Sequence, residues 1–181
     1  FGILFPIVPL LFTEPTSPFF ILPSGYSIET GYLLLGSLIG LYPLAQFVAT
    51  PILGQLSDSY GRKPVISLSV AGTIISSILF GIGIIIGSIP LLFFSRLLKG
   101  ATGGLISIVQ ASIADTTESG SKSKNFGMIG AAFGLGFIIG PFLGGVLSTR
   151  SILPFFGPST PFFFASALSF VSLMIVQTLL R

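Results

Sequence analysis

Charged residues are scarce in this sequence. Only 7% of its 181 residues are Asp, Glu, Lys or Arg, whereas 51% are hydrophobic and the mean hydropathy is +1.02. A soluble domain carries about 25% charged residues, so this chain cannot cover a water-facing surface. We therefore predict an integral membrane protein whose main partner is the lipid bilayer.

Cysteine and histidine are absent altogether. The lack of Cys excludes a disulfide framework and a thiolate metal site. The lack of His removes the commonest metal ligand and general base, so we expect no metal site and no cofactor. The net charge of +3 comes from basic residues too sparse to track a phosphate backbone, and we expect no nucleic-acid partner.

Long apolar runs make up most of the chain. They predict six helices, at about residues 1–12, 28–53, 65–87, 91–114, 126–147 and 161–180. A transmembrane β-barrel fits less well, because its strands would alternate polar and apolar residues. The expected fold is an all-α integral membrane protein, a six-transmembrane-helix bundle that forms one domain over residues 1–181.

The two ends of the chain are unusual for a membrane protein of this kind. The first apolar run has only 12 residues, against the roughly 20 needed to span a bilayer. The chain ends at Arg181, directly after another apolar run. Both ends look cut, so we expect the first half of a longer protein.

Basic residues in the predicted loops indicate the orientation of the bundle. Those on one side are Arg62, Lys63, Lys122, Lys124 and Arg181, whereas the opposite loops hold only Arg150. Cytoplasmic loops carry an excess of Lys and Arg. We therefore expect a multi-pass protein of the plasma membrane with the connection around Arg62 in the cytoplasm.

The densest charge cluster between two apolar runs lies at residues 54–64, G-Q-L-S-D-S-Y-G-R-K-P. Gly61 allows a backbone turn that other residues resist. Asp58 can cap a helix N-terminus or pair with Arg62, and Asp115, at the end of the fourth predicted helix, is the other anion within reach of Arg62. A loop that only fixes a tight turn would explain Gly61 but not this set of charges.

This pattern resembles the signature loop between helices 2 and 3 of the major facilitator superfamily of transporters. The resemblance implies the N-terminal half of a twelve-helix fold, with the C-terminal six-helix half as the missing partner. In that family the loop is a conformational latch, whose Asp contacts a helix N-terminus in the second half and whose Arg contacts an acid near the end of helix 4. By resemblance, the latch residues here are Gly54, Asp58, Gly61, Arg62, Lys63 and Asp115.

The fourth predicted helix has a polar face. At about 100° per residue, one stripe holds Arg96, Lys99, Gly100, Gly103, Ser107, Gln110 and Ala114. A cation in lipid costs at least about 2.5 kcal/mol, so we expect Arg96 in the bundle interior rather than reaching for the headgroups; for Lys99 both positions stay open. Arg96 followed by Gly100 resembles the helix 4 motif of the superfamily, which implies a role for Arg96 in proton coupling.

The fifth predicted helix is rich in glycine. Gly130, Gly134, Gly136, Gly140, Gly144 and Gly145 fall within about half of its circumference. Such a ridge lets another helix approach closely, and Pro141 should bend the helix. The ending G-P-x-x-G-G resembles the motif that marks proton-driven antiporters of the superfamily.

Polar residues at membrane depth are candidates for a substrate cavity. Gln46 needs a hydrogen-bond partner there; it either contacts substrate or bonds a neighbouring helix, and the second interpretation is favoured. With Ser107 and Gln110 it forms the candidate substrate cavity.

Two short segments, residues 114–117 and 133–136, look like the tetracycline-resistance branch of the drug/proton antiporters. The resemblance implies antiport of small amphipathic drugs, such as tetracycline-like compounds, by alternating access and driven by a proton gradient. One alternative is a self-contained six-helix protein that dimerises into a transporter or pore. An intramembrane enzyme is disfavoured, because Glu14, Glu29, Asp58, Asp115 and Glu118 all lie at helix ends or in loops, and no enzymatic activity is expected.

Overall fold

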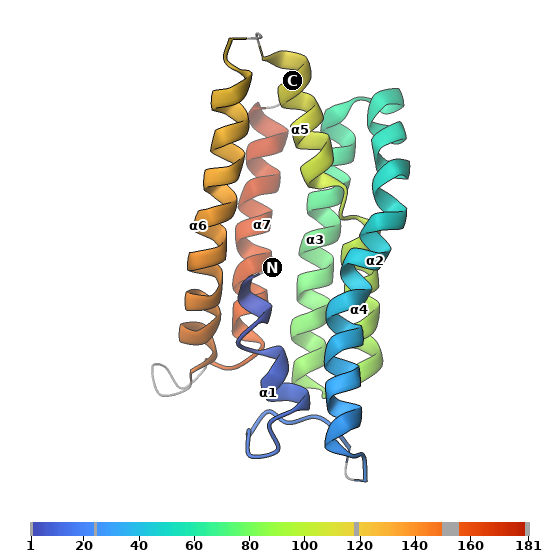
Figure 1. Ribbon diagram of the computed structural model, residues 1–181, viewed down its shortest axis with the longest axis vertical. Coiled ribbons are helices and arrows are strands. Elements are labelled where there is room, and N and C mark those ends of the chain that lie inside the picture. Colours follow the sequence, from blue (N-terminus) through green and yellow to red (C-terminus); the bar gives the residue numbers. More distant parts are fainter. Residues whose placement is uncertain (1, 24, 118–119, 150–155, 180–181) are drawn as a thin grey trace.

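The computed structural model describes residues 2–23, 25–117, 120–149 and 156–179, and within them every regular element is a helix (Figure 1). A short 3-10 turn, η1 (Gly2–Leu4), and a short helix, α1 (Val8–Phe12), come first. The longer helices are α2 (Ile28–Tyr60), α3 (Arg62–Ile85), α4 (Ile89–Ala101), α5 (Leu105–Thr116), α6 (Lys122–Ser148) and α7 (Thr160–Leu179).

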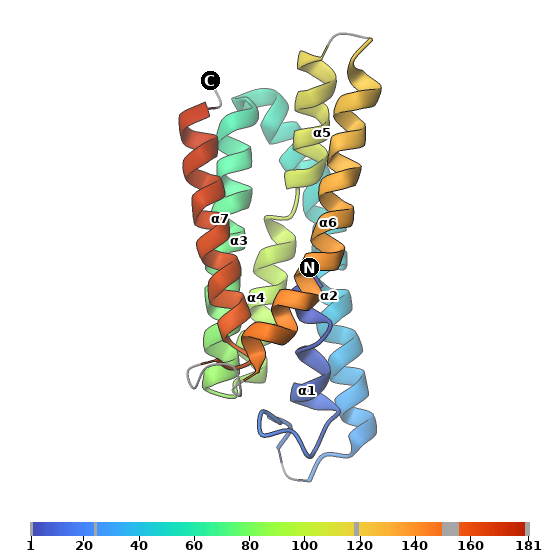
Figure 2. The same cartoon turned by 90° about the vertical axis from the view of Figure 1, so that its left-hand side faces the viewer.

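Five stretches are long and apolar enough to cross a membrane: α2, α3, α4 with α5, α6, and most of α7. A spanning chain must satisfy its backbone hydrogen bonds internally, and a continuous helix does this. The bundle of near-parallel helices predicted from the apolar runs is therefore confirmed (Figures 1 and 2).

The first predicted helix, residues 1–12, is not one helix. It divides into η1 and α1, joined by turn residues around Pro6. Proline has no N–H to donate and fixes its own φ, so Pro6 interrupts the helix while Pro9 fits the first turn of α1.

The predicted loop at residues 54–64 is mostly helical, which corrects the sequence interpretation. Helix α2 continues to Tyr60, α3 begins at Arg62, and Gly61 alone separates them. Gly61 has φ +92°, a conformation that side chains with a Cβ resist. The expected turn at Gly61 is therefore confirmed, but the charges around it are presented by two helix ends.

The fourth predicted helix is also interrupted, because Thr102, Gly103 and Gly104 form a turn between α4 and α5. Glycine is a poor helix former, and the hydroxyl of Thr102 donates to the carbonyl oxygen of Leu98. The turn changes the phase of the helix, so the predicted polar stripe does not continue through it. Arg96 and Gly100 are buried, whereas Ser107 and Gln110 are exposed on α5.

Two apolar clusters hold the bundle together. One joins α1, α2, α3, α4 and α7 near the turn between α3 and α4, and includes Phe12, Leu38, Phe80, Leu92 and Phe162. The other lies near the α2–α3 junction and includes Leu53, Val65, Ile66, Val70 and Ile108. Between these ends, α2 and α4 approach closely at Gly100, where an added Cβ would lie 2.6 Å from the carbonyl oxygen of Tyr42.

Replacing Gly100 with leucine is expected to lower the stability of the bundle. The added side chain would push α4 away from α2, and overpacking of this kind costs roughly 1–3 kcal/mol. Thermal unfolding of the detergent-solubilised protein measures the effect. Gly36→Leu is the matched control, because nothing in the described chain lies within 4 Å of a Cβ added to Gly36; equal loss in both variants would contradict the prediction.

Of the basic residues predicted to share one side, Arg62 and Lys63 lie at the same end of the bundle. Arg62 bonds Asp115 at the end of α5, and Lys63 bonds the last turn of α7. The α2–α3 junction and the ends of α5 and α7 therefore meet at the upper end of Figure 1. Arg150 and Arg181 lie outside the described residues.

Candidate functional site

Arg62 is the centre of a charged network at the α2–α3 junction. Its guanidinium lies 2.7 Å from the Asp58 carboxylate of α2 and 2.8 Å from the Asp115 carboxylate of α5. It also donates to the hydroxyl of buried Ser57 at 3.2 Å. Both contacts predicted for Arg62, with Asp58 and with Asp115, are therefore present, and they connect α3 to α2 and α5.

Lys63, which the sequence analysis placed with the same network, points to a different helix. Its ammonium donates to the main-chain carbonyl oxygen of Gln177 in the last turn of α7, at 2.9 Å. The Gln177 side chain donates to the hydroxyl of Ser67, which in turn donates to the carbonyl oxygen of Lys63, both at 2.9 Å. We call this closed ring of Lys63, Ser67 and Gln177 the α3–α7 ring. It fixes the end of α7 to the beginning of α3.

Gly54 lies on α2, with no close neighbour among the described residues. A Cβ added to Gly54 would have no neighbouring atom of another helix or loop within 4 Å in the described chain. The structure therefore gives Gly54 no packing role within this bundle, in contrast to Gly61, whose backbone conformation requires glycine.

Arg96 lies in the bundle interior, as expected. Only 4% of its surface is exposed, and its guanidinium carbon lies 4.3 Å from the ring centroid of Phe80 on α3. A cation over an aromatic face is stabilised by about 0.5–2 kcal/mol. The Arg96 Nε has no hydrogen-bond acceptor among the described residues, and Tyr42 of α2 lines a small cavity together with Arg96.

Gln46 bonds the turn between α4 and α5, a contact of the kind that the favoured interpretation predicts. Its amide donates to the carbonyl oxygen of Gly103 at 2.6 Å. The turn at residues 102–104 leaves this carbonyl without its helical partner, so Gln46 supplies the missing donor. Ser107 and Gln110 are exposed on α5, whereas Gln46 is partly buried.

Replacing Gln46 with leucine is expected to destabilise the junction of α4 and α5. The Gly103 carbonyl would lose its donor, and hydrogen bonds between membrane helices contribute about 0.6–1.7 kcal/mol. Thermal unfolding in detergent measures the loss. Gln55→Leu is the control, because the Gln55 side chain is exposed further along α2; an unfolding temperature of Gln46→Leu that matches the control would count against this role.

Only two glycines of the α6 ridge have another segment packed closely against them in the described chain. A Cβ added to Gly140 would lie 3.1 Å from the Cα of Gly2, and one added to Gly144 would lie 3.0 Å from the carbonyl oxygen of Ile3. Added Cβ atoms at the other glycines of the ridge, Gly130, Gly134, Gly136 and Gly145, meet nothing within 4 Å in the described chain. Helix α6 runs through Pro141 without ending, and Figure 2 shows it changing direction in this C-terminal part.

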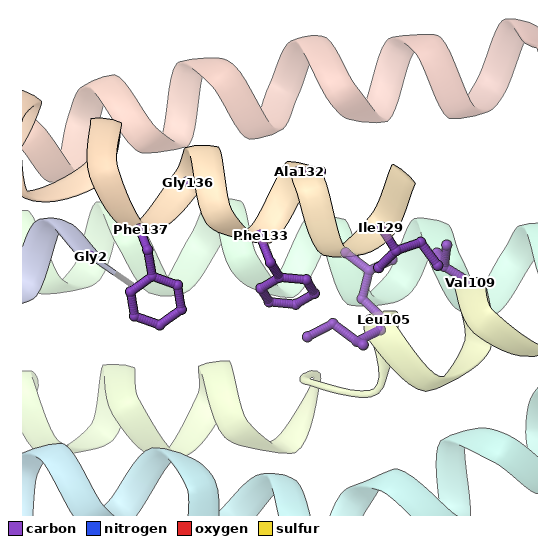
Figure 3. Close-up of a pocket in the computed structure, with 9 residues that line it drawn as sticks. Gly2, Leu105, Val109, Ile129, Ala132, Phe133, Gly136 and Phe137 are labelled. Carbon is purple, nitrogen blue, oxygen red and sulfur yellow. The ribbon is translucent and has the colours of Figure 1, made fainter. Parts of the chain in front are cut away.

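An apolar pocket of about 460 Å³ lies between α5 and α6 (Figure 3). Phe133 and Phe137, one helical turn apart on α6, project from that helix into the space beside Leu105 of α5 (Figure 3). The other lining residues are Gly2, Ile106, Val109, Ile129, Ala132 and Gly136. These walls offer dispersion contacts and no charged group. Of these residues, Gly136 is also part of the predicted antiporter motif.

A sequence profile of the Major Facilitator Superfamily matches residues 1–181. The chain belongs to the major facilitator superfamily. Among curated superfamily relatives, it is 35% identical over 176 residues to tetracycline resistance protein, class B, of Escherichia coli, which covers 97% of the chain. It is 34% identical over 139 residues to multidrug resistance protein 2 of Bacillus subtilis (strain 168), which covers 76% of the chain.

The superfamily fold is also seen in a solved structure. The crystal structure of a D-xylose-proton symporter matches 98% of the chain with a TM-score of 0.69, at 17% sequence identity. The match covers 46% of that structure, and 39% of the class B tetracycline resistance protein. The chain therefore spans less than half the length of these superfamily members, as expected for a six-helix half.

Several contacts of the candidate site were not anticipated. Ser57 directly precedes Asp58, so its bond to Arg62 could have been inferred from the helix that continues to Tyr60. The pairing of Phe80 with Arg96 and of Gln177 with Ser67 joins residues of different helices. Nothing in the local sequence indicates these partners, because they depend on the rotation of each helix in the bundle.

Proposed function

We propose that this chain is the N-terminal half of a transporter that exports small amphipathic drugs in exchange for protons. The observation that carries the proposal is the buried guanidinium of Arg96 in a superfamily chain related to tetracycline and multidrug resistance proteins. An intramembrane charge is expensive and is retained where it serves transport. We assign Arg96 to proton coupling.

The Arg62 network is proposed to be the latch of alternating access. Asp58 is 67% exposed, so a carboxylate oxygen remains accessible to a helix end from the C-terminal six-helix half. Docking of that half would close the cytoplasmic side, and its release would open it. Gly54 would allow the close approach, because its face of α2 is open. We place this end of the bundle at the cytoplasmic face of the plasma membrane, following the basic residues gathered there.

The substrate surface is proposed to lie on the face of α5 that points away from the other helices of this bundle. Ser107 and Gln110 are exposed there, opposite buried Ile108, and Ile106 beside them lines the apolar pocket. Hydrogen-bonding groups next to an apolar wall suit an amphipathic molecule such as a tetracycline-like compound. The unused glycines of α6, which belong to the antiporter motif, would let the second half pack closely.

Transport by the full-length protein in proteoliposomes tests the proposal. An imposed proton gradient should drive accumulation of tetracycline, and collapsing the gradient with a protonophore should abolish it. Accumulation that persists without the gradient would contradict proton coupling, and a lack of tetracycline transport would contradict the drug class. The mass of the native polypeptide distinguishes a fused second half from a second copy of this chain, which would give a mass near 19.0 kDa.

A further inference from the structure

Lys99 lies on the buried face of α4. At about 100° per residue, its direction falls in the middle of an arc set by four buried residues, Leu92, Ser95, Arg96 and Gly100. The exposed residues of α4, such as Phe94 and Leu97, lie on the opposite side. Lys99 itself is partly covered, and no hydrogen bond or ion pair of its ammonium is found within the described ranges. Both positions were open for Lys99 from the sequence, and the structure places it on the interior face of α4.

The surroundings of Lys99 are polar but hold no anion. A small cavity beside it is lined by Ser76, Ser77 and Phe80 of α3, Ser95 and Arg96 of α4, and Phe162 of α7. Arg96 is the charged group that faces Lys99, and from α2 the Tyr42 phenol faces Arg96. Among the described acids, Asp58 and Asp115 are bound to Arg62 at the other end of the bundle, and Glu14 and Glu29 lie at the beginning of α2 or before it.

Arginine and lysine differ in whether they can lose a proton when they are buried beside another cation. A guanidinium stays protonated in proteins, so Arg96 supplies a fixed positive charge but cannot deliver a proton. A lysine ammonium can lose its proton when it is buried, and a neutral amine next to a fixed cation avoids the repulsion of two charges. Of these two side chains, only Lys99 can change its charge during a transport cycle.

We infer that Lys99 is a proton-carrying group of the transport cycle, alternately charged and neutral beside the fixed charge of Arg96. The inference rests on the proposed proton-coupled function. The Lys99 amine takes a proton from water on one side of the membrane and returns it to water on the other side. Ser76, Ser77 and Ser95 line the cavity that a transferred proton would cross, and the turn at Thr102, three residues further on, separates α4 from α5.

Two substitutions of Lys99 in the full-length protein test the inference. Lys99→Arg keeps a permanent charge and Lys99→Gln keeps none, so neither can exchange a proton at neutral pH. In proteoliposomes, both should lose accumulation of tetracycline against its gradient by at least about tenfold, while exchange of labelled for unlabelled tetracycline continues. The pH profile of transport should flatten in both variants. Lys124→Arg and Lys124→Gln, at the first turn of α6, are the matched controls and should resemble the wild type.

Proton release gives a second measurement. Addition of tetracycline to the wild-type protein in detergent, followed with a pH-sensitive dye, should release protons, and Lys99→Gln should release at least one fewer per protein. Unchanged release and an unchanged pH profile in both Lys99 variants would overturn the inference while leaving proton-coupled export intact. If Lys99→Gln does not fold, Lys99→Arg decides by the same criteria. A wild-type protein that ignores the proton gradient would overturn both the inference and the proposed function.

Discussion

Replacing Arg96 with alanine is expected to abolish proton-driven drug export without preventing membrane insertion. The guanidinium is a buried charge in the bundle interior, 4% exposed and 4.3 Å from the ring of Phe80. Its removal takes away the fixed charge that the proposed cycle uses. Because alanine leaves no polar group behind, the bundle loses packing but gains no unsatisfied charge. Drug accumulation by cells that express the full-length variant measures the effect, with the amount of protein in the membrane as the reference.

Replacing Arg96 with lysine tests whether export depends on the positive charge alone or also on the planar shape of the guanidinium. Arg96→Lys keeps a cation but loses the planar group that lies over Phe80, so it should retain only part of the export. Phe80→Leu is the matched change on the other side of the contact, and it should lower stability more than transport. Export by Arg96→Ala at the wild-type level would refute the assignment of Arg96 to proton coupling.

Changing Asp58 to asparagine is expected to slow transport by roughly tenfold, while the folded bundle stays intact. Asp58 and Asp115 are 67% and 59% exposed, and exposed ion pairs contribute only about 0–1 kcal/mol to stability. The effect on rate can be larger, because a change of about 1.4 kcal/mol in the balance between two states alters a rate or population tenfold. Turnover in proteoliposomes, compared with the unfolding temperature in detergent, separates the two effects.

The partner acid provides the control for this variant. Asp115→Asn removes the other carboxylate bound to Arg62 but leaves Asp58 available to the second half. If Asp58 contacts the second half, Asp58→Asn should be the more severe change. Equal turnover in the wild type and in Asp58→Asn would show that the carboxylate has no role in opening and closing.

The sequence predicted those features of the fold that depend on neighbouring residues only. The apolar runs predict the spanning helices because a bilayer admits no unsatisfied backbone. Gly61 was identified correctly, because its φ of +92° is a property of one residue. The pairing of Arg62 with Asp115 joins residues 53 positions apart, and it was anticipated only through the resemblance to a known family.

The helical periodicity of polar residues gave a wrong prediction in the fourth predicted helix, because that helix is interrupted. The polar stripe through Arg96, Ser107 and Gln110 assumed one continuous helix, but the turn at residues 102–104 divides it. Glycines at 103 and 104 allow such a turn without requiring it, since many membrane helices contain glycine. The donor from Gln46 on another helix stabilises the interruption, and this contribution is invisible in the local sequence. Residues 54–60 were taken for a loop because they are polar and charged, although α2 continues through them to Tyr60.

Arg62 and Lys63 are neighbours in the chain but hold different helices. Arg62 reaches α2 and α5, and Lys63 joins α7 through the α3–α7 ring. The beginning of α3 is therefore a hub, and three helices are fastened to it at one membrane face. If the C-terminal half docks at this hub, as proposed, we expect α2, α3, α5 and α7 to move together. Helix α6 is attached differently: Asn125 in its first turn donates to the hydroxyl of Thr117, just after α5, and its other end touches η1 through Gly140 and Gly144. Movement of the hub would therefore reach α6 through the end of α5.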